Sequence, residues 1–355
     1  MNSEYLTLIY LILSTMIGAG ILALPYAFYN AGIINSLFLF FFSMLITYIS
    51  AKIILNASLK YYSNQLPEII NRYLGKFFGT FFFISFLLSL FFVNIAYLNV
   101  INFSVKTFYS QSESITLLIA AIVMSISFVG FWLIEKSEKL LFTIKTLIYF
   151  AFLSFVIFIT PKYDLSLISF NLKDNLDFLL ISIFAFSFYS IIPSLLLVSK
   201  DKKVLRNSFI ISLVIAFSFY FLFAFIVSSR VGNKEIATLN FNELFNILTL
   251  FLVITPYIIL SWVMSETIAE SFEISKRVSL LLSYTLPFIF FLLFPKSFLS
   301  YIEITSGFFI LSNYFIFGYL GYKLNRRIEV NKLESILLMI ISIILIFYEA
   351  VNLIL

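Results

Sequence analysis

Residues 14–28 read STMIGAGILALPYAF, and this stretch decides how the rest of the chain is interpreted. It lies within an apolar segment long enough to cross a membrane, yet it contains Gly18, Gly20 and, five residues later, Pro25. Glycine destabilises a helix interior by about 1 kcal/mol, and Pro25 has no amide hydrogen to donate to the preceding turn. We therefore expect the helix to be unwound over residues 18–21.

Unwound backbone at membrane depth needs partners, so a broken helix lines a cavity or contacts other protein segments. Free amides at the start of a half-helix bind an anionic group such as a carboxylate, and freed carbonyls bind a cation or an ammonium group. Both features suit an amino acid. The expected backbone contacts are Ile17, Gly18, Ala19, Gly20 and Ile21. In the alternative interpretation, the two glycines only permit close helix packing.

The composition is that of a membrane protein. Of 355 residues, 62% are hydrophobic and 12% are charged, which is too few polar groups for the surface of a water-soluble domain. Cysteine and histidine are absent, which excludes disulfides, thiolate chemistry and imidazole-based catalysis. The formal charge of +5 is spread over short connectors and does not suggest nucleic acid. We expect no enzymatic activity, catalytic residue, cofactor or metal site, and no obligatory protein partner.

Apolar runs between charged or Pro/Asn-rich breaks predict eleven membrane-spanning helices in one domain, residues 1–355. The predicted spans are 5–31, 34–58, 77–105, 115–134, 140–160, 178–198, 207–229, 245–269, 279–295, 299–321 and 333–354.

The basic residues predict the orientation. With a cytoplasmic N-terminus, sixteen of the 23 lysines and arginines fall on the cytoplasmic side, six fall outside, and Lys145 lies within a span. The positive-inside rule therefore places the N-terminus in the cytoplasm and the C-terminus outside, in a multi-pass protein of the plasma membrane. Residues 61–76 are interpreted as a short interfacial helix or, equally, as a plain loop.

Residues 14–28 resemble the first helix of the amino acid/auxin permease family, which includes bacterial aromatic amino acid permeases. That family belongs to the amino acid–polyamine–organocation superfamily. The resemblance implies an all-α, leucine-transporter-like fold in which helices 1 and 6 are broken. Its two inverted repeats of five helices would cover residues 5–160 and 178–321, with an eleventh helix at 333–354.

Residues 186–195, FSFYSIIPSL, resemble the family's sixth-helix pattern of Phe-Gly-Phe-His, three residues, then Pro-Ser-Leu. Ser187 stands at the glycine position and Tyr189 at the histidine position. Serine can satisfy freed backbone groups, and tyrosine can donate a hydrogen bond or form a pocket wall. The alternative is a phenylalanine-rich, lipid-facing helix that is kinked at Pro193. The candidate substrate contacts here are Phe186, Ser187, Tyr189 and Ser190.

Lys145 is the candidate for ion coupling, because an ionisable side chain inside a membrane span is a functional candidate by default. In proton-coupled members of the superfamily, a lysine on this helix reaches between helices 1 and 8, where sodium sits in sodium-coupled relatives. The resemblance therefore favours H⁺ over Na⁺ as the coupling ion. The alternative is that the long side chain reaches the cytoplasmic interface.

Two other groups of polar residues complete the prediction. Ser261 and Ser265 share one face of the eighth span and offer oxygens to a cation, which keeps sodium coupling open. Glu266 is a further coupling candidate, and its alternative role is in a solvated acidic face near Lys276 and Arg277. Asn94 and Tyr97 are expected to close the pocket opposite the first helix, with helix–helix hydrogen bonds as their alternative role.

Together these features predict a secondary active transporter, a proton-coupled symporter of neutral amino acids, with aromatic or branched side chains as candidates, working by alternating access. One alternative is a membrane receptor or sensor subunit on the same fold, such as the spore-germinant sensors, which bind amino acids without pumping them. The other is a sodium-coupled amino acid transporter.

Overall fold

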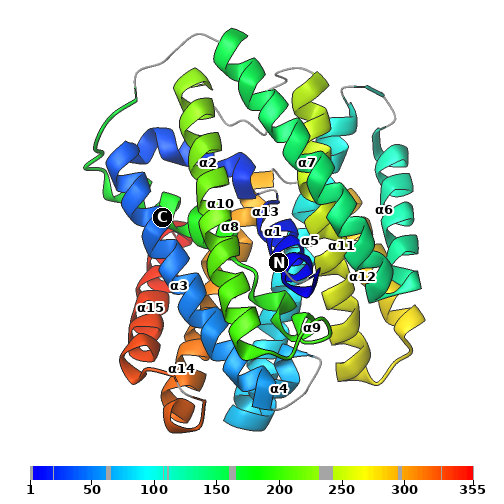
Figure 1. The fold of residues 1–355 in the computed structure, drawn as a ribbon, viewed down its shortest axis with the longest axis vertical. Coiled ribbons are helices and arrows are strands. Elements are labelled where there is room, and N and C mark those ends of the chain that lie inside the picture. Colours follow the sequence, from blue (N-terminus) through cyan, green and yellow to red (C-terminus); the bar gives the residue numbers. More distant parts are fainter. Residues whose placement is uncertain are drawn as a thin grey trace.

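Every regular element in the part of the chain that the structure describes is a helix (Figure 1). The structure is a computed structural model, and it describes residues 3–18, 20–60, 65–106, 108–109, 112–159, 165–231, 243–294, 298–328 and 330–354. Within these ranges, eight helices are long and apolar enough to cross a membrane, and the bent pair α1–α2 makes a ninth candidate span. The chain is therefore an all-helical polytopic membrane protein.

The elements follow one another along the chain with short connections. In order they are α1 (Ser3–Met16), α2 (Gly20–Ala31), α3 (Ile33–Lys60), α4 (Leu66–Leu74), α5 (Lys76–Lys106), α6 (Ser112–Val129), α7 (Phe131–Ile159), α8 (Leu172–Phe186), η1 (Tyr189–Ile191), α9 (Ile192–Leu195), α10 (Lys202–Val231), α11 (Glu243–Phe272), α12 (Lys276–Leu293), α13 (Phe298–Ile304), η3 (Thr305–Ile310), α14 (Leu311–Ile328) and α15 (Lys332–Ile354). The fourth and tenth predicted spans correspond to the shorter α6 and to α13–η3–α14, where η3 is a π-helical turn.

Two predicted boundaries are wrong for identifiable reasons. The predicted span 115–134 overruns α6, because Gly130, at a φ of 109°, ends that helix and lets α7 begin at Phe131. The basic residues that follow were expected in a loop, but they form the first turns of α7. Similarly, α8 begins six residues before the predicted 178, since the Asn171 side chain accepts a hydrogen bond from the amide of Lys173 and caps the helix.

The short helix α4 is the helical form of the segment that was expected as either an interfacial helix or a loop, residues 61–76. Pro67 stands in its first turn, where a missing amide hydrogen costs nothing. Its apolar side chains, including Ile69 and Ile70, are buried against the bundle. Residues 61–64 lie outside the described residues.

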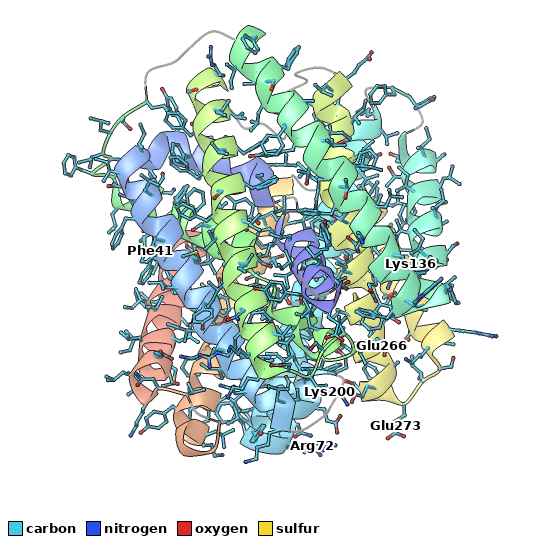
Figure 2. The ribbon with its side chains drawn as sticks, in the orientation of Figure 1. Phe41, Arg72, Lys136, Lys200, Glu266 and Glu273 are labelled. Carbon is cyan, nitrogen blue, oxygen red and sulfur yellow. The ribbon has the colours of Figure 1, made fainter. Side chains whose placement is uncertain are left out.

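Burial separates central helices from peripheral ones. In the most apolar segment of each span, 83% of the residues are buried in α8–α9 and 78% in α11, whereas only 33% are buried in α7 and 28% in α15. Peripheral helices present large apolar side chains outward, among them Phe41 and Phe158, which is 86% exposed. Figure 2 shows Phe41 on the flank of the bundle and Arg72, Lys200 and Glu273 at one end. An apolar flank with charged ends fits a lipid environment.

The first helix is interrupted beside the two glycines, but earlier than the predicted 18–21, because Gly20 and Ile21 already belong to α2. α1 ends at Met16 and α2 begins at Gly20, and the two helix axes differ by 61°. The amide of Gly18 turns back to the carbonyl of Met16 (2.8 Å), while the amide of Ile21 donates to the carbonyl of Gly18 (3.3 Å). The regular i to i−4 pattern is lost over this turn, so nearby carbonyls need other donors.

The central helix α8 is interrupted as well. Ser187 follows its last residue in an extended conformation, with φ −65° and ψ 119°, and the chain continues as the single 3₁₀ turn η1 and the four-residue helix α9. Because α8 packs against α2, the two interruptions meet in the core of the bundle.

Candidate functional site

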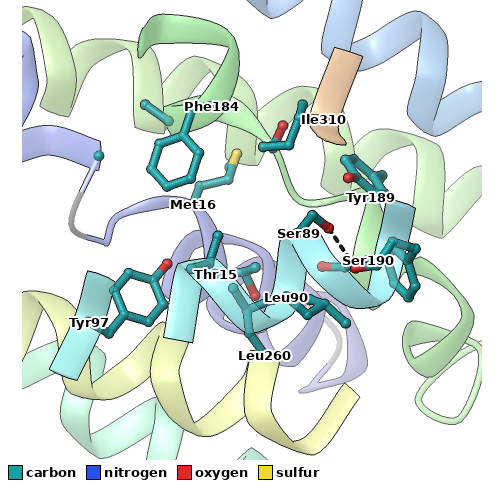
Figure 3. A pocket seen from close by; sticks show the side chains of 15 residues that line it. Thr15, Met16, Ser89, Leu90, Tyr97, Phe184, Tyr189, Ser190, Leu260 and Ile310 are labelled. Atoms are coloured by element: carbon teal, nitrogen blue, oxygen red, sulfur yellow. Dashed lines mark hydrogen bonds between the residues drawn. The ribbon is translucent and has the colours of Figure 1, made fainter. Parts of the chain in front are cut away.

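A cavity of about 40 Å³ lies between the two helix breaks and the middle parts of α5 and α11 (Figure 3). Five of the predicted contacts line it: Gly20, Tyr97, Ser187, Tyr189 and Ser190. The same cavity is bounded by Phe86 and Phe184. Its free space holds a few water molecules, whereas pockets for small organic ligands measure about 300–1,000 Å³. This conformation is therefore closed around the site.

The other predicted contacts are placed differently. Ile17 and Gly18 lie in the break, Ile21 lies in the first turn of α2, and Ala19 lies outside the described residues. The remaining two side chains are absent from the cavity lining. The Asn94 amide faces the sulfur of Met264 on α11 (3.7 Å). The ring of Phe186 packs against Phe40 and Tyr220, with centroids 6.0 and 5.0 Å away.

Carbonyl groups around the first break are bonded by side chains from three other helices. The carbonyl of Ser14 accepts from Thr255 on α11 (3.5 Å), that of Met16 from Tyr220 on α10 (2.6 Å), and that of Ile17 from Lys145 on α7 (2.8 Å). Carbonyls without helical partners are costly at membrane depth unless other donors reach them. Three surrounding helices thus hold the broken segment in place.

One phenol contacts both helix breaks. The hydroxyl of Tyr220, which is fully buried, lies 2.6 Å from the carbonyl oxygen of Met16 and 2.7 Å from that of Ala185 near the end of α8. A phenol has a single hydrogen to donate, so the two carbonyls share it. Tyr220 therefore ties the two interrupted helices to α10 at the edge of the cavity.

We expect Tyr220→Phe to weaken substrate binding by roughly tenfold. The two buried carbonyls lose their donor, an unsatisfied buried group costs about 1–3 kcal/mol, and about 1.4 kcal/mol is a factor of ten in affinity. Binding to the purified protein and its melting temperature in detergent measure the two effects.

The matched control is Tyr149→Phe, which removes a buried phenol that donates to the carbonyl of Phe219 (2.6 Å), a residue of α10 outside the cavity lining. We expect it to lower the melting temperature without changing affinity. Equal affinities in the two variants would contradict the role given to Tyr220.

Both glycines are needed for close approach. A Cβ atom at Gly18 would lie 2.8 Å from Cγ of Pro256 and 3.3 Å from the hydroxyl of Tyr97. At Gly20 it would lie 3.1 Å from Cα of Ala185, on the other broken helix. The glycines therefore permit close packing, as the packing interpretation expects, and Gly20 also lines the cavity.

Polar side chains support the second break. The hydroxyl of Ser187 donates to the carbonyl of Ile183 (3.0 Å) and lies 2.8 Å from the phenol of Tyr314 on α14. The phenol of Tyr189 accepts from the amide of Asn313 (2.8 Å), again on α14. Serine thus satisfies the backbone at the end of α8, and α14 positions the aromatic wall.

Lys145 lies between α1 and α11, and it is 1% exposed. Its Nζ donates to the carbonyl of Ile17 and to the hydroxyl of Thr255, both at 2.8 Å. The side chain is buried inside the bundle and does not extend along its surface. Sequence reasoning missed Thr255, and the available signal was a hydroxyl directly before Pro256 in the middle of a membrane span.

The other coupling candidates on α11 face elsewhere. Ser265 pairs with the hydroxyl of Ser279 on α12 (3.0 Å), and Ser261 lies beside the phenol of Tyr284 on the same helix. Glu266 forms an ion pair with Lys276 (3.0 Å). The serines belong to the α11–α12 interface and the ion pair lies at one end of the bundle, where Figure 2 shows Glu266.

The cavity has no charged lining residue among the described residues. In the same part of the chain, no group of three or more acidic, histidine or cysteine side chains is placed to hold a metal ion. A bound zwitterion would therefore depend on backbone groups and hydroxyls for its charged ends.

Comparison with known proteins identifies a family. The sequence profile of the tryptophan/tyrosine permease family matches residues 1–248. A protein of Plasmodium berghei (strain Anka) named "Putative amino acid transporter AAT1" is 36% identical over 127 residues, which are 33% of this chain and 21% of that protein. The matched stretch thus spans about a fifth of the relative.

Proposed function

Since this chain belongs to the tryptophan/tyrosine permease family, we propose that it is a proton-coupled symporter of aromatic amino acids. The observation that carries the proposal is the bond from Lys145 to the carbonyl of Ile17. It joins an ionisable side chain to the broken helix that borders the cavity. A change in the charge of Lys145 changes how firmly that segment is held, and this links proton binding to substrate binding.

The cavity lining supports a neutral amino acid with an aromatic side chain. Phe86, Phe184 and Tyr189 supply apolar and aromatic walls, and the described lining residues bring no charge. The substrate carboxylate would bind at the start of α2, where amides of the first turn lack helical partners and Gly20 admits close approach. The ammonium group would meet carbonyls and hydroxyls at the second break.

The closed cavity supports alternating access as the mode of transport. A substrate far larger than about 40 Å³ enters only when the helices around the breaks move apart. We propose that the pairing of two broken helices reflects an inverted repeat of five helices each, with α15 as the added helix. The N-terminus and the end of the bundle that carries Arg72 and Lys200 would face the cytoplasm.

The position of Lys145 supports H⁺ over Na⁺ as the coupling ion. Its Nζ occupies the space between the carbonyl of Ile17 and the hydroxyl of Thr255, with the Ser14 carbonyl 3.5 Å from that hydroxyl. These three oxygens form a set that suits a small cation. The ammonium group of Lys145 occupies the position that such a cation would take. Its charge appears when the side chain binds a proton and disappears when it releases one.

The test is uptake by the purified protein in liposomes. Labelled tryptophan, tyrosine, phenylalanine, leucine and alanine are offered with an inward proton gradient in sodium-free buffer, with a sodium gradient, or with neither. We expect the proton gradient alone to drive accumulation, and aromatic substrates to exceed alanine by at least tenfold. Accumulation that depends on sodium would overturn the coupling ion, and binding without uptake would indicate a receptor.

A further inference from the structure

A second ionisable side chain is buried on the same helix as Lys145. Glu138 is 0% exposed, and neither carboxylate oxygen has a hydrogen-bond partner among the described residues. It faces the hydroxyl of Ser14 on α1, which is likewise without a partner. Native structures rarely leave a buried carboxyl group without partners, because its desolvation is costly. The proposed function does not use this group.

Helix geometry relates Glu138 to Lys145. Seven residues make almost two turns, so the two side chains share one face of α7, with Cα atoms about 10 Å apart along the axis. Lys145 is the positive charge that acts on Glu138. Phe142 lies on the same face between them, and its ring centroid is 5.2 Å from the Lys145 Nζ. In the closed conformation, the ring therefore stands beside the path from the ammonium group to the carboxyl group.

Hydroxyl groups lead onward from Glu138. The charge of Glu138 acts on the phenol of Tyr284 on α12. The hydroxyl of Tyr284 lies 2.7 Å from the hydroxyl of Ser127 at the end of α6. Ser127 lines a cavity of about 400 Å³ whose wall also includes Glu266 and Lys276. This cavity lies toward the end of the bundle that we assign to the cytoplasm, and the hydroxyls of Tyr284 and Ser127 stand between it and Glu138.

Phenol groups from neighbouring helices also lie near this face of α7. Two phenols on helices that pack against α7 lie near it: Tyr10 of α1, whose ring contacts Phe142 (5.6 Å), and Tyr257 of α11, whose ring contacts Tyr284 (5.5 Å). Of the two carboxyl groups on α7, Glu135 and Glu138, Glu138 is the nearer to Lys145 along the helix.

We propose that Glu138 accepts the proton from Lys145 and passes it to the cytoplasmic cavity. In this step an N–H bond of the Lys145 ammonium group breaks and an O–H bond of Glu138 forms, leaving a neutral amine and a neutral carboxylic acid. Glu138 then gives the proton to water in the cavity, past Tyr284 and Ser127. The transfer takes place once the closed arrangement around Phe142 and α1 opens. This inference rests on the proposed proton coupling.

The test is Glu138→Gln, which keeps the shape of the side chain and removes its ability to carry a proton. Two activities are compared in liposomes: exchange of labelled for unlabelled tryptophan at equal pH, which needs no net proton release, and accumulation driven by a proton gradient. We expect exchange to stay within about threefold of the unmodified protein and accumulation to fall at least tenfold.

Glu135→Gln is the matched control, because Glu135 lies one turn earlier on α7, is half-buried, and accepts a weak hydrogen bond from Thr7 (3.4 Å). Both of its activities should be unchanged. Accumulation by Glu138→Gln within threefold of the unmodified protein overturns the inference while leaving proton coupling intact. An equal loss of exchange and accumulation also overturns it, because that result indicates a structural role. If the unmodified protein shows no proton-driven accumulation, both proposals fail.

A second measurement applies if Glu138→Gln does not fold. The unmodified protein is treated with dicyclohexylcarbodiimide, which reacts with protonated carboxyl groups in apolar surroundings, and its peptides are mapped by mass spectrometry. Lys136 and Lys139 flank Glu138, so cleavage after lysine separates it from Glu135. An adduct on Glu138 that blocks accumulation and spares exchange supports the proposal. Accumulation that persists with Glu138 fully modified overturns it.

Discussion

Lys145→Met is expected to abolish accumulation driven by a proton gradient, with a loss of at least a hundredfold. Methionine has a similar length and no charge, so it keeps much of the packing between α1 and α11 and removes both hydrogen bonds of the Nζ. Without a proton carrier, uptake can only follow the substrate gradient. Initial rates in liposomes with and without the proton gradient measure the effect, and any remaining flux should be independent of that gradient.

Two further variants separate coupling from structure. Lys145→Arg keeps a positive charge but cannot release its proton, so it should also fail to accumulate substrate. Lys139→Met, on an exposed turn of the same helix, should behave like the unmodified protein. Proton-driven accumulation by Lys145→Arg at a normal rate would contradict the carrier role and would leave only a structural one.

Gly20→Leu is expected to remove measurable substrate binding, a loss of more than a hundredfold in affinity. The first added atom would already lie 3.1 Å from Ala185 and from the ring of Phe184, and the rest of the side chain would occupy the cavity between the two breaks. Because Ala185 contributes backbone atoms to this contact, a rotamer change cannot relieve it. Equilibrium binding of labelled tryptophan to detergent-purified protein measures the effect.

The control for Gly20→Leu adds a comparable bulk where there is room. Ala151→Leu lies on an exposed position of α7 and should bind substrate normally. Gly20→Ala should give an intermediate loss, since its neighbours must shift by only a few tenths of an ångström. Size-exclusion profiles show whether each variant remains folded. Normal affinity in a folded Gly20→Leu protein would mean that substrate binds elsewhere.

The class of protein and the approximate position of the first break follow from the amino-acid sequence alone. Composition and the length of the apolar runs specify a membrane bundle, because a chain with 12% charged residues has too few polar groups for a water-exposed surface. Gly18, Gly20 and Pro25 specify the interruption because they act on the backbone locally, whatever surrounds them. Such effects depend on neighbouring residues in the chain, and they are visible in one sequence.

The helix faces could not be determined in the same way. α5 is apolar on all sides, so its periodicity does not say which residues look into the cavity. The structure turns Tyr97 toward the cavity and Asn94 toward Met264, although both were expected at the pocket. Phe186 likewise packs away from the cavity against α10. Where every face is apolar, only the packing of neighbouring helices decides the rotation.

The partners of the ionisable groups depend on contacts between helices that are distant in the chain. From sequence, Lys145 either reached the interface or stayed buried, and its burial depends on Ile17 and Thr255, which are more than 100 positions away along the chain. Glu138 was overlooked because it stands among basic residues in what was expected to be a loop. The available signal was its spacing of seven residues from Lys145, which places two side chains on one face of a helix. That signal applies only if both residues belong to one helix, and they do because α6 ends before Gly130 and α7 begins at Phe131. Local propensities set where helices break, whereas contacts between distant helices set which charges are buried together.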